Sequence, residues 1–476
     1  MSPQPDHVDH LFSRPSVYET LFSMLSPRES IQVSRSCQAA HDAYLNFTHR
    51  AYDINRHLFY FFSDPVAFRS LQARTGTLIS GSDALQFLER TVYPGSNLNI
   101  YTHPGHTLEV LDWLVNAEGY RYAPFPRRPR NYRDDVKPWD PQQSSMRWNT
   151  WVRDNGTGEN GLGKIYPFTK VSGYGGERLR VQVMEAHMSP FIAITSFYST
   201  CTMNIIAFDC AYSLYPVQTF EDRETLVTSK EIDKSHIDKY TRRGWSVVRV
   251  PFCPADARYK TSRWQPAAFR TPLDSRTWRV RLDMTGVETR PSLNPPPLST
   301  SLPWDPVVAN SWELNTLDAC QKGAALPDHS DCTQPAMTCH HSQLHSGFFR
   351  YTYAVADAAL PMFIDQYGND DIRRNPQAWL DAEFPRYVQK ALGELFRMSG
   401  GDTFPAISEQ MAYLSNLLPN RQASSSSMQQ PISVSTPSPA PLSRPSQITP
   451  DSRTSNAPSL KHNLAQALPR LRGMFE

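Results

Sequence analysis

Polar and apolar positions in the first 60 residues alternate at helical spacing. Ser26-Pro27-Arg28-Glu29 is a complete helix start, in which Ser caps, Pro takes the first helical position and Glu reaches back from the third. The modestly apolar stripe that follows at helical spacing contains Ile31, Ser34, Cys37 and Tyr44. We therefore predict a segment of short helices over residues 11–60.

Residues 65–290 alternate between extended and helical patterns, which predicts a mixed α/β core. Thr77–Ser80 predicts a strand that ends at Gly81-Ser82, and a helix capped by Ser82 or Asp83 follows it. The further expected elements are a strand around Leu98 and Ile100, a helix marked by Leu108, Leu111, Leu114 and Val115, and strands at Leu179–Glu185, Thr202–Phe208 and Trp278–Leu282.

The second half of the chain changes in composition twice. Residues 291–346 contain NPPPL and few periodic runs, so we expect an irregular connection. In residues 347–420 a helical part is predicted, with an apolar face of Val388, Ala391, Leu392, Leu395 and Phe396. Residues 421–476 are rich in Ser, Pro, Thr and Gln, a composition that predicts a disordered tail. The expected fold class is α+β.

Charge and cysteine content narrow the class of protein. The net charge of 48 − 46 = +2 gives no strong case for nucleic-acid binding. The 7 cysteines are sparse and odd in number, which does not indicate a disulfide framework. The start, MSPQPDHVDH, lacks the features of a secretory signal, and the densest apolar stretch is broken by Ser, Thr and Asn, so no membrane span is expected. We expect a soluble protein of the cytoplasm or nucleus.

The stretch from residue 77 to 103 has the order strand, Gly-Ser, helix, strand. Gly81 would let a phosphate approach the backbone, Ser82 can donate to it, and the start of the helix adds a favourable dipole. On the next strand Asn97 and Asn99 point to the same face, because strand side chains alternate.

This stretch resembles the nucleotidyltransferase fold. The resemblance implies that Gly81 and Ser82 bind a nucleoside triphosphate and that positions 97 and 99 bind two divalent metals through aspartates. Asn97 and Asn99 stand there instead, which removes two negative charges from a Mg²⁺ site. We therefore expect degenerate metal positions, no catalytic residue and no cofactor.

An active enzyme is the alternative interpretation. A metal-dependent nucleotidyltransferase would use Mg²⁺, a nucleoside triphosphate and a rearranged carboxylate site, with Glu185 or Asp83 as candidates. In the strand Leu179–Glu185, Gln182 lies on one face and Glu185 on the other.

Residues 15–45 resemble an F-box. Leu25-Ser26-Pro27-Arg28-Glu29 and Val33-Ser34-Arg35-Ser36-Cys37 match the family pattern, although the usual Leu-Pro-x-Glu opening is absent. The resemblance implies that four residues face the small adaptor subunit of a cullin-type ubiquitin ligase: Leu21, Phe22, Leu25 and Ile31. The other interpretation is a helical pair that packs on the chain's own core and binds no partner.

The whole chain is similar to a group of fungal proteins that join an F-box-like start to a nucleotidyltransferase-like core. The resemblance implies this architecture. Because Asn97 and Asn99 stand where the chemistry needs carboxylates, we expect a non-catalytic protein-interaction module, an F-box-like adaptor with a degenerate nucleotidyltransferase-like domain. The resemblance brings no established reaction with it.

Two further sequence patterns fit a phosphate-binding loop and a zinc site only in part. Gly158–Lys164 fits the spacing of a phosphate-binding loop, but Ile165 replaces the required Ser or Thr, so we favour a glycine-rich hairpin. A cysteine and histidine set could bind zinc, but its spacing matches no standard site: Cys320, Cys332, Cys339, His340, His341 and His345.

Overall fold

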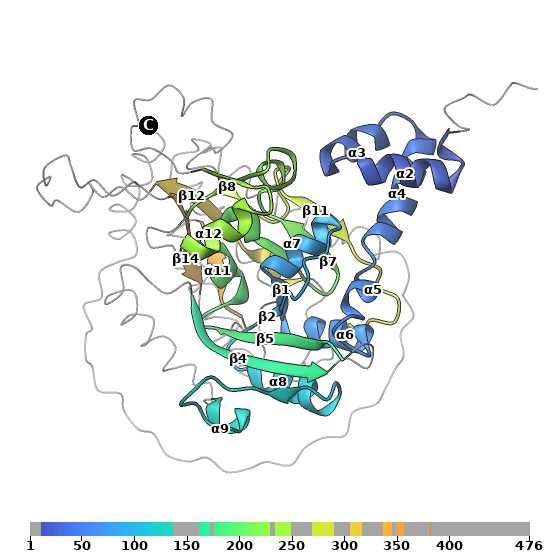
Figure 1. Cartoon of the computed structure of the whole chain (residues 1–476). Coiled ribbons are helices and arrows are strands. Elements are labelled where there is room, and N and C mark those ends of the chain that lie inside the picture. The colour runs from blue at the N-terminus through green and yellow to red at the C-terminus, as the bar shows by residue number, and fades with distance from the viewer. Residues whose placement is uncertain are drawn as a thin grey trace, which may run out of the picture. The chain divides into compact units, whose positions relative to one another are not determined.

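The computed structural model describes residues 11–136, 161–171, 176–228, 234–248, 269–289, 305–316, 337–344, 349, 351–356 and 381. It confirms the α+β class, with helices at the N-terminus followed by an eight-stranded mixed sheet (Figure 1). The chain divides into two units, Met1–Ala391 and Leu392–Glu476, and all the described residues belong to the first. The predicted disordered tail and nearly all of the predicted C-terminal helical part lie outside the described residues.

Four helices form the N-terminal segment: α2 (Pro15–Met24), α3 (Pro27–Ser34), α4 (Gln38–Ala51) and α5 (Ile54–Leu58). The predicted start of α3 is confirmed, because Ser26 Oγ accepts a hydrogen bond from the Glu29 amide (3.2 Å) and Glu29 Oε2 accepts one from the Ser26 amide (2.9 Å). A small apolar cluster holds α2 and α4 together; it contains Phe12, Tyr18, Phe22, Ala40, Ala43 and Phe47.

The large sheet has the strand order β11-β7-β6-β1-β2-β5-β4-β3. Its strands are β1 (Leu78–Ser80), β2 (Leu98–Thr102), β3 (Arg121–Tyr122), β4 (Leu162–Val171), β5 (Arg178–Ala186), β6 (Asn204–Ile206), β7 (Cys210–Ser213) and β11 (Trp278–Arg281). β2 and β5 run parallel, and every other neighbouring pair is antiparallel. The strands predicted near Leu98, at 77–80, at 179–185 and at 278–282 are confirmed to within one or two residues.

Helix α6 (Pro65–Thr75) precedes β1 in the sequence, α7 (Ser82–Glu89) connects β1 to β2, and α8 (Thr107–Asn116) lies between β2 and β3. Their apolar residues pack in the main core against one face of β2 and β5, to which Leu98, Ile100, Val181 and Val183 contribute. Because strand side chains alternate, Asn99 and Tyr101 lie on the opposite face of β2. The two faces of this parallel pair therefore differ in chemistry.

Shorter elements complete the described part of the chain. They are α9 (Tyr132–Asp135), α11 (Pro190–Thr195), η1 (Thr200–Thr202), η2 (Val217–Glu221), β8 (Glu224–Leu226), α12 (Lys234–Thr241), β9 (Ser246–Val248), β10 (Phe269–Arg270), η4 (Pro306–Ala309), β12 (Trp312–Thr316), β13 (Met337–His340), β14 (Ser342–Leu344) and β15 (Tyr353–Val355). The strand predicted at 202–208 is shorter, because its first residues form η1. The predicted irregular connection and the predicted helical part both contain strands, β12 to β14 and β15 respectively.

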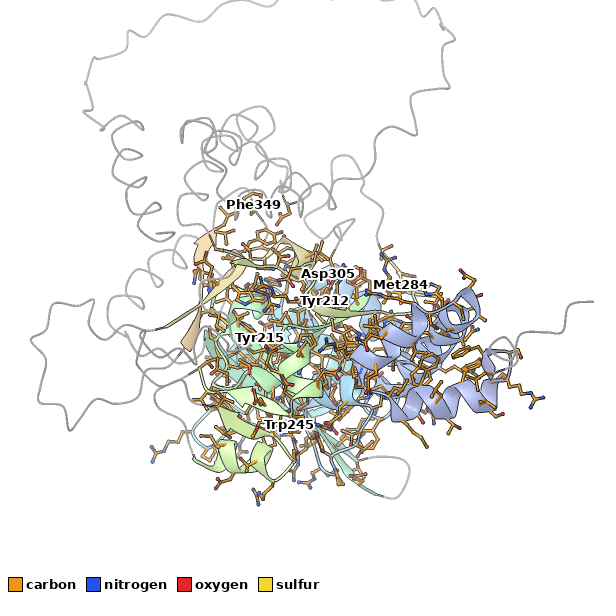
Figure 2. All side chains as sticks on the ribbon, turned by 90° about the horizontal axis from the view of Figure 1, so that it is seen from above. Tyr212, Tyr215, Trp245, Met284, Asp305 and Phe349 are labelled. Carbon is orange, nitrogen blue, oxygen red and sulfur yellow. The ribbon has the colours of Figure 1, made fainter. Side chains whose placement is uncertain are left out.

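Residues 305–316 return to the large sheet through a buried polar contact. Tyr212 Oη donates a hydrogen bond to Asp305 Oδ2 (2.9 Å), and the two residues lie together in Figure 2. The Val307 amide donates to Asp305 Oδ1 (3.0 Å), and burial together with the nearby charge of Asp209 raises the pKa of Asp305. Two neighbouring buried carboxyl groups disfavour being charged together, so one of them tends to hold a proton. In the part of the chain described above, no helix is long and apolar enough to cross a membrane.

Candidate functional site at the Gly81–Ser82 turn

The Gly81–Ser82 turn connects β1 directly to α7. Gly81 precedes the helix with φ 77° and ψ −142°, a conformation that is open almost only to glycine. Ser82 is the first helical residue, and no side chain caps α7, so the predicted cap at Ser82 or Asp83 is wrong. The predicted order of strand, Gly-Ser and helix is confirmed.

The middle of β2 faces this turn. A Cβ atom on residue 81 would lie 3.3 Å from Asn99 Nδ2 and 3.9 Å from Tyr101 Oη. Within the described part of the chain, Asn99 Oδ1 is buried and has no hydrogen-bond partner. Asn97 lies just before β2 and is half-buried. The sequence-predicted residues Gly81, Ser82 and Asn99 therefore come together.

Helix α12 places an amine at the same turn. Lys239 Nζ donates a hydrogen bond to Ser82 Oγ (3.0 Å), and Ser82 Oγ lies 3.0 Å from Tyr240 Oη. Burial, and then the nearby positive charge of Arg243, lower the pKa of Lys239. The guanidinium of Arg243 stacks 3.7 Å from the centre of the Tyr93 ring. The sequence analysis missed Lys239, Tyr240 and Arg243.

The carboxylates named for the active alternative do not reach the turn. Asp83 Oδ2 binds His57 Nε2 at 3.0 Å, and its side chain is only 3% exposed. Burial alone would lower the pKa of His57, but the charge and hydrogen bond of Asp83 outweigh it and raise that pKa. Glu185 pairs with Thr102, on the face of the sheet opposite Asn99, and accepts a hydrogen bond from the Tyr166 hydroxyl (3.1 Å).

A pair of divalent metals does not fit the residues at this turn. Asn99 and its cross-strand partner Gln182 are both neutral, so they offer no anionic oxygen to offset the charge of two metal ions. No group of three or more His, Cys, Asp or Glu side chains within the described ranges could hold a metal ion. The described side chains at the turn offer hydroxyl, amide and amine groups instead.

The four F-box-like candidates differ in exposure. Phe22 is fully buried, and its ring packs against those of Phe12, Tyr44 and Phe47. This burial differs from the expectation that Phe22 faces a partner. Leu21 and Leu25 are half-buried against the same helical cluster, and Ile31 is half-buried against the main core.

Hydrogen bonds of Arg90 and Arg28 join these helices to the core. Arg90, just after α7, donates to the carbonyl oxygens of Phe22 (3.2 Å) and Leu25 (3.3 Å). The Arg28 amide donates to Glu221 Oε1 (2.9 Å). The helices pack on the chain's own core, while Met24 at the end of α2 is 79% exposed.

The two weaker patterns have structural roles where they are described. Lys164 lies in β4 and donates to Asp135 Oδ1 (2.9 Å), and residues 158–160 lie outside the described ranges. Cys339 lies in β13, with its Sγ 3.3 Å from Tyr215 Oη. Cys320, Cys332 and His345 lie outside the described residues.

No protein-family model, curated protein or solved structure matches this chain. The functional argument therefore depends on the geometry of the turn and of the N-terminal helices.

Proposed function

We propose that this protein is a protein-interaction module that does not catalyse nucleotidyl transfer, an F-box-like adaptor joined to a degenerate nucleotidyltransferase-like domain. The observation that carries the proposal is the position of Asn99. Its side chain lies beside Gly81, where the resemblance implies a metal-binding aspartate.

The electrostatics of the turn support this choice over an active transferase. Metal-dependent nucleotidyl transfer needs anionic ligands to offset the charge of two Mg²⁺ ions. Asn99 and Gln182 supply neutral oxygens, Asp83 is paired with His57, and Glu185 lies on the other face of the sheet. A nucleotide held at Gly81 and Ser82 would therefore bind without metal and without turnover.

The interaction surface that we propose lies at the break between α2 and α3. Leu25 is half-buried there, and the neighbouring Met24 is exposed. A capping box fixes the direction of α3, so the break has a defined shape for a partner to recognise. The partner of the proposed adaptor is the small adaptor subunit of a cullin-type ubiquitin ligase.

A binding assay between the full chain and that purified adaptor subunit tests the proposal. We expect binding by the unmodified chain and its loss in Leu25→Asp. Because Leu25 also packs within the helical cluster, Met24→Asp is the second variant, since an exposed side chain can change without loss of folding. Leu45→Asp, which changes an exposed residue of α4, is the matched control and should bind normally. Absence of binding by the unmodified chain, or full binding by both Leu25→Asp and Met24→Asp, would refute the proposed adaptor role.

A further inference from the structure

Ser82 lies at a sharp turn between a strand and a helix, and two polar side chains lie within hydrogen-bond distance of its hydroxyl. Lys239 Nζ and Tyr240 Oη are each 3.0 Å from Ser82 Oγ. Ser82 is 8% exposed and Lys239 is half-buried, so the contact lies largely out of contact with solvent. A hydroxyl in direct contact with an amine is the arrangement in which serine is activated by a neighbouring base.

We propose that Ser82 is a nucleophile, with Lys239 as its general base, that accepts acyl groups from small carboxylic esters. The activity goes beyond the proposed interaction function and does not depend on it. It also needs no metal, in agreement with the neutral residues around the turn.

Groups from several elements face Lys239 and keep its amine available as a base. Burial and the charge of Arg243 lower the pKa of Lys239, which raises the fraction of neutral amine. The Cys201 thiolate would oppose this effect, but burial raises the pKa of Cys201 to about 11, so the thiol is neutral near pH 7. Tyr240 is neutral as well, because burial raises its pKa to about 12.

Three described carboxylates near the turn or near Lys239 in the sequence have other partners or are exposed. Asp83 binds His57, Glu89 binds Arg223 and Tyr93, and Asp238 beside Lys239 in the sequence is exposed. A carboxylate paired with Lys239 would stabilise the charged form of its side chain. The described contacts of Lys239 thus favour proton acceptance from Ser82.

The reaction is balanced in atoms and protons. Ser82 Oγ attacks the acyl carbon while its proton passes to the neutral amine of Lys239. The bond from the acyl carbon to the ester oxygen then breaks, and the leaving alkoxide takes the proton back from the Lys239 ammonium. Water, deprotonated by Lys239 in the same way, hydrolyses the acyl-serine and restores Ser82. Asn99 Nδ2, which faces the turn, and the uncapped first amides of α7 are the donors available to the oxyanion.

The test uses the full chain with two probes, 4-nitrophenyl acetate and a small fluorophosphonate. Intact mass and peptide mapping should show one adduct on Ser82, and Ser82→Ala should remove it. Lys239→Arg keeps the positive charge but cannot accept a proton near neutral pH, so we expect the labelling rate to fall on the order of 10²-fold or more. Ser96→Ala, at a half-buried serine before β2, is the control and should label like the unmodified chain.

A pH profile separates a base from a merely structural lysine. The labelling rate of the unmodified chain should rise with pH through a midpoint below ~10.4, the ordinary pKa of lysine, and Lys239→Arg should lose that rise. Absence of an adduct on Ser82, or equal rates for Lys239→Arg and the unmodified chain, would overturn the proposal. Adaptor binding uses Leu25 and Met24, so the two proposals can fail separately.

Discussion

Asn99 and Gly81 fit against each other: the side-chain nitrogen of Asn99 lies 3.3 Å from the position that a Cβ atom would take on residue 81. This contact joins the centre of β2 to the start of α7. It leaves no room for a larger residue at the turn without movement of Asn99. A change of residue 81 in the turn therefore affects Asn99 in β2.

Gly81→Ala should destabilise the protein by about 1–3 kcal/mol, because alanine rarely adopts the backbone conformation of Gly81 and its methyl group would press on Asn99. Urea unfolding measures the change. Gly95→Ala is the matched control, since Gly95 has φ 69° but nothing within 4 Å of an added Cβ. We expect a smaller loss there, and equal losses would refute the role of the Asn99 contact.

Phe22→Ala should loosen the N-terminal helices. The Phe22 ring is fully buried among three other aromatic rings, and truncation of such a side chain costs about 3–5 kcal/mol. Hydrogen exchange should show lost protection in α2 and α4 but not in α8. Met24→Ala, at a 79% exposed position in the same helix, should change the free energy of unfolding by less than ~0.5 kcal/mol. Unchanged protection in Phe22→Ala would contradict the described packing.

Stability should fall as the pH rises above ~4, the ordinary pKa of an aspartic acid. Burial raises the pKa of Asp305 well above that value, and burial also raises the pKa of Asp209. The folded state then holds a proton that the unfolded state releases, so this contribution to stability is lost as the pH rises through the folded pKa. Thermal unfolding from pH 4 to 9 should show a decline that Asp305→Asn makes shallower. Asp134→Asn, at an exposed position, should keep the slope of the unmodified chain. An identical slope in Asp305→Asn would show that Asp305 does not hold the proton.

Local signals in the sequence predict much of the first 290 residues. Ser26 and Glu29 predict the start of α3, because a capping box depends only on two residues that are three positions apart. The order of β1, Gly81 and α7 can likewise be predicted, because all three lie in one short stretch of the sequence. The cap of α7 was predicted wrongly because Ser82 is a common capping residue, whereas its hydroxyl binds Lys239 and Tyr240 here.

The long-range part of the site could not be predicted. Lys239 lies 157 residues from Ser82, in a stretch of mixed charge without a motif. The contact between Asp209 and Asp305 likewise depends on the return of residues 305–316 to the sheet. The burial of Phe22 could not be predicted, because an apolar stripe on a helix does not show whether it packs on the chain's own core or against a partner. Such contacts follow from packing rather than from local pattern.

The central claim is that the Gly81–Ser82 turn does not support metal-dependent nucleotidyl transfer. Calorimetric titration of the full chain with a nucleoside triphosphate, with and without Mg²⁺, followed by an assay for released pyrophosphate, tests it most directly. We predict that Mg²⁺ does not strengthen binding and that no product forms. Metal-enhanced binding together with product formation would contradict the account.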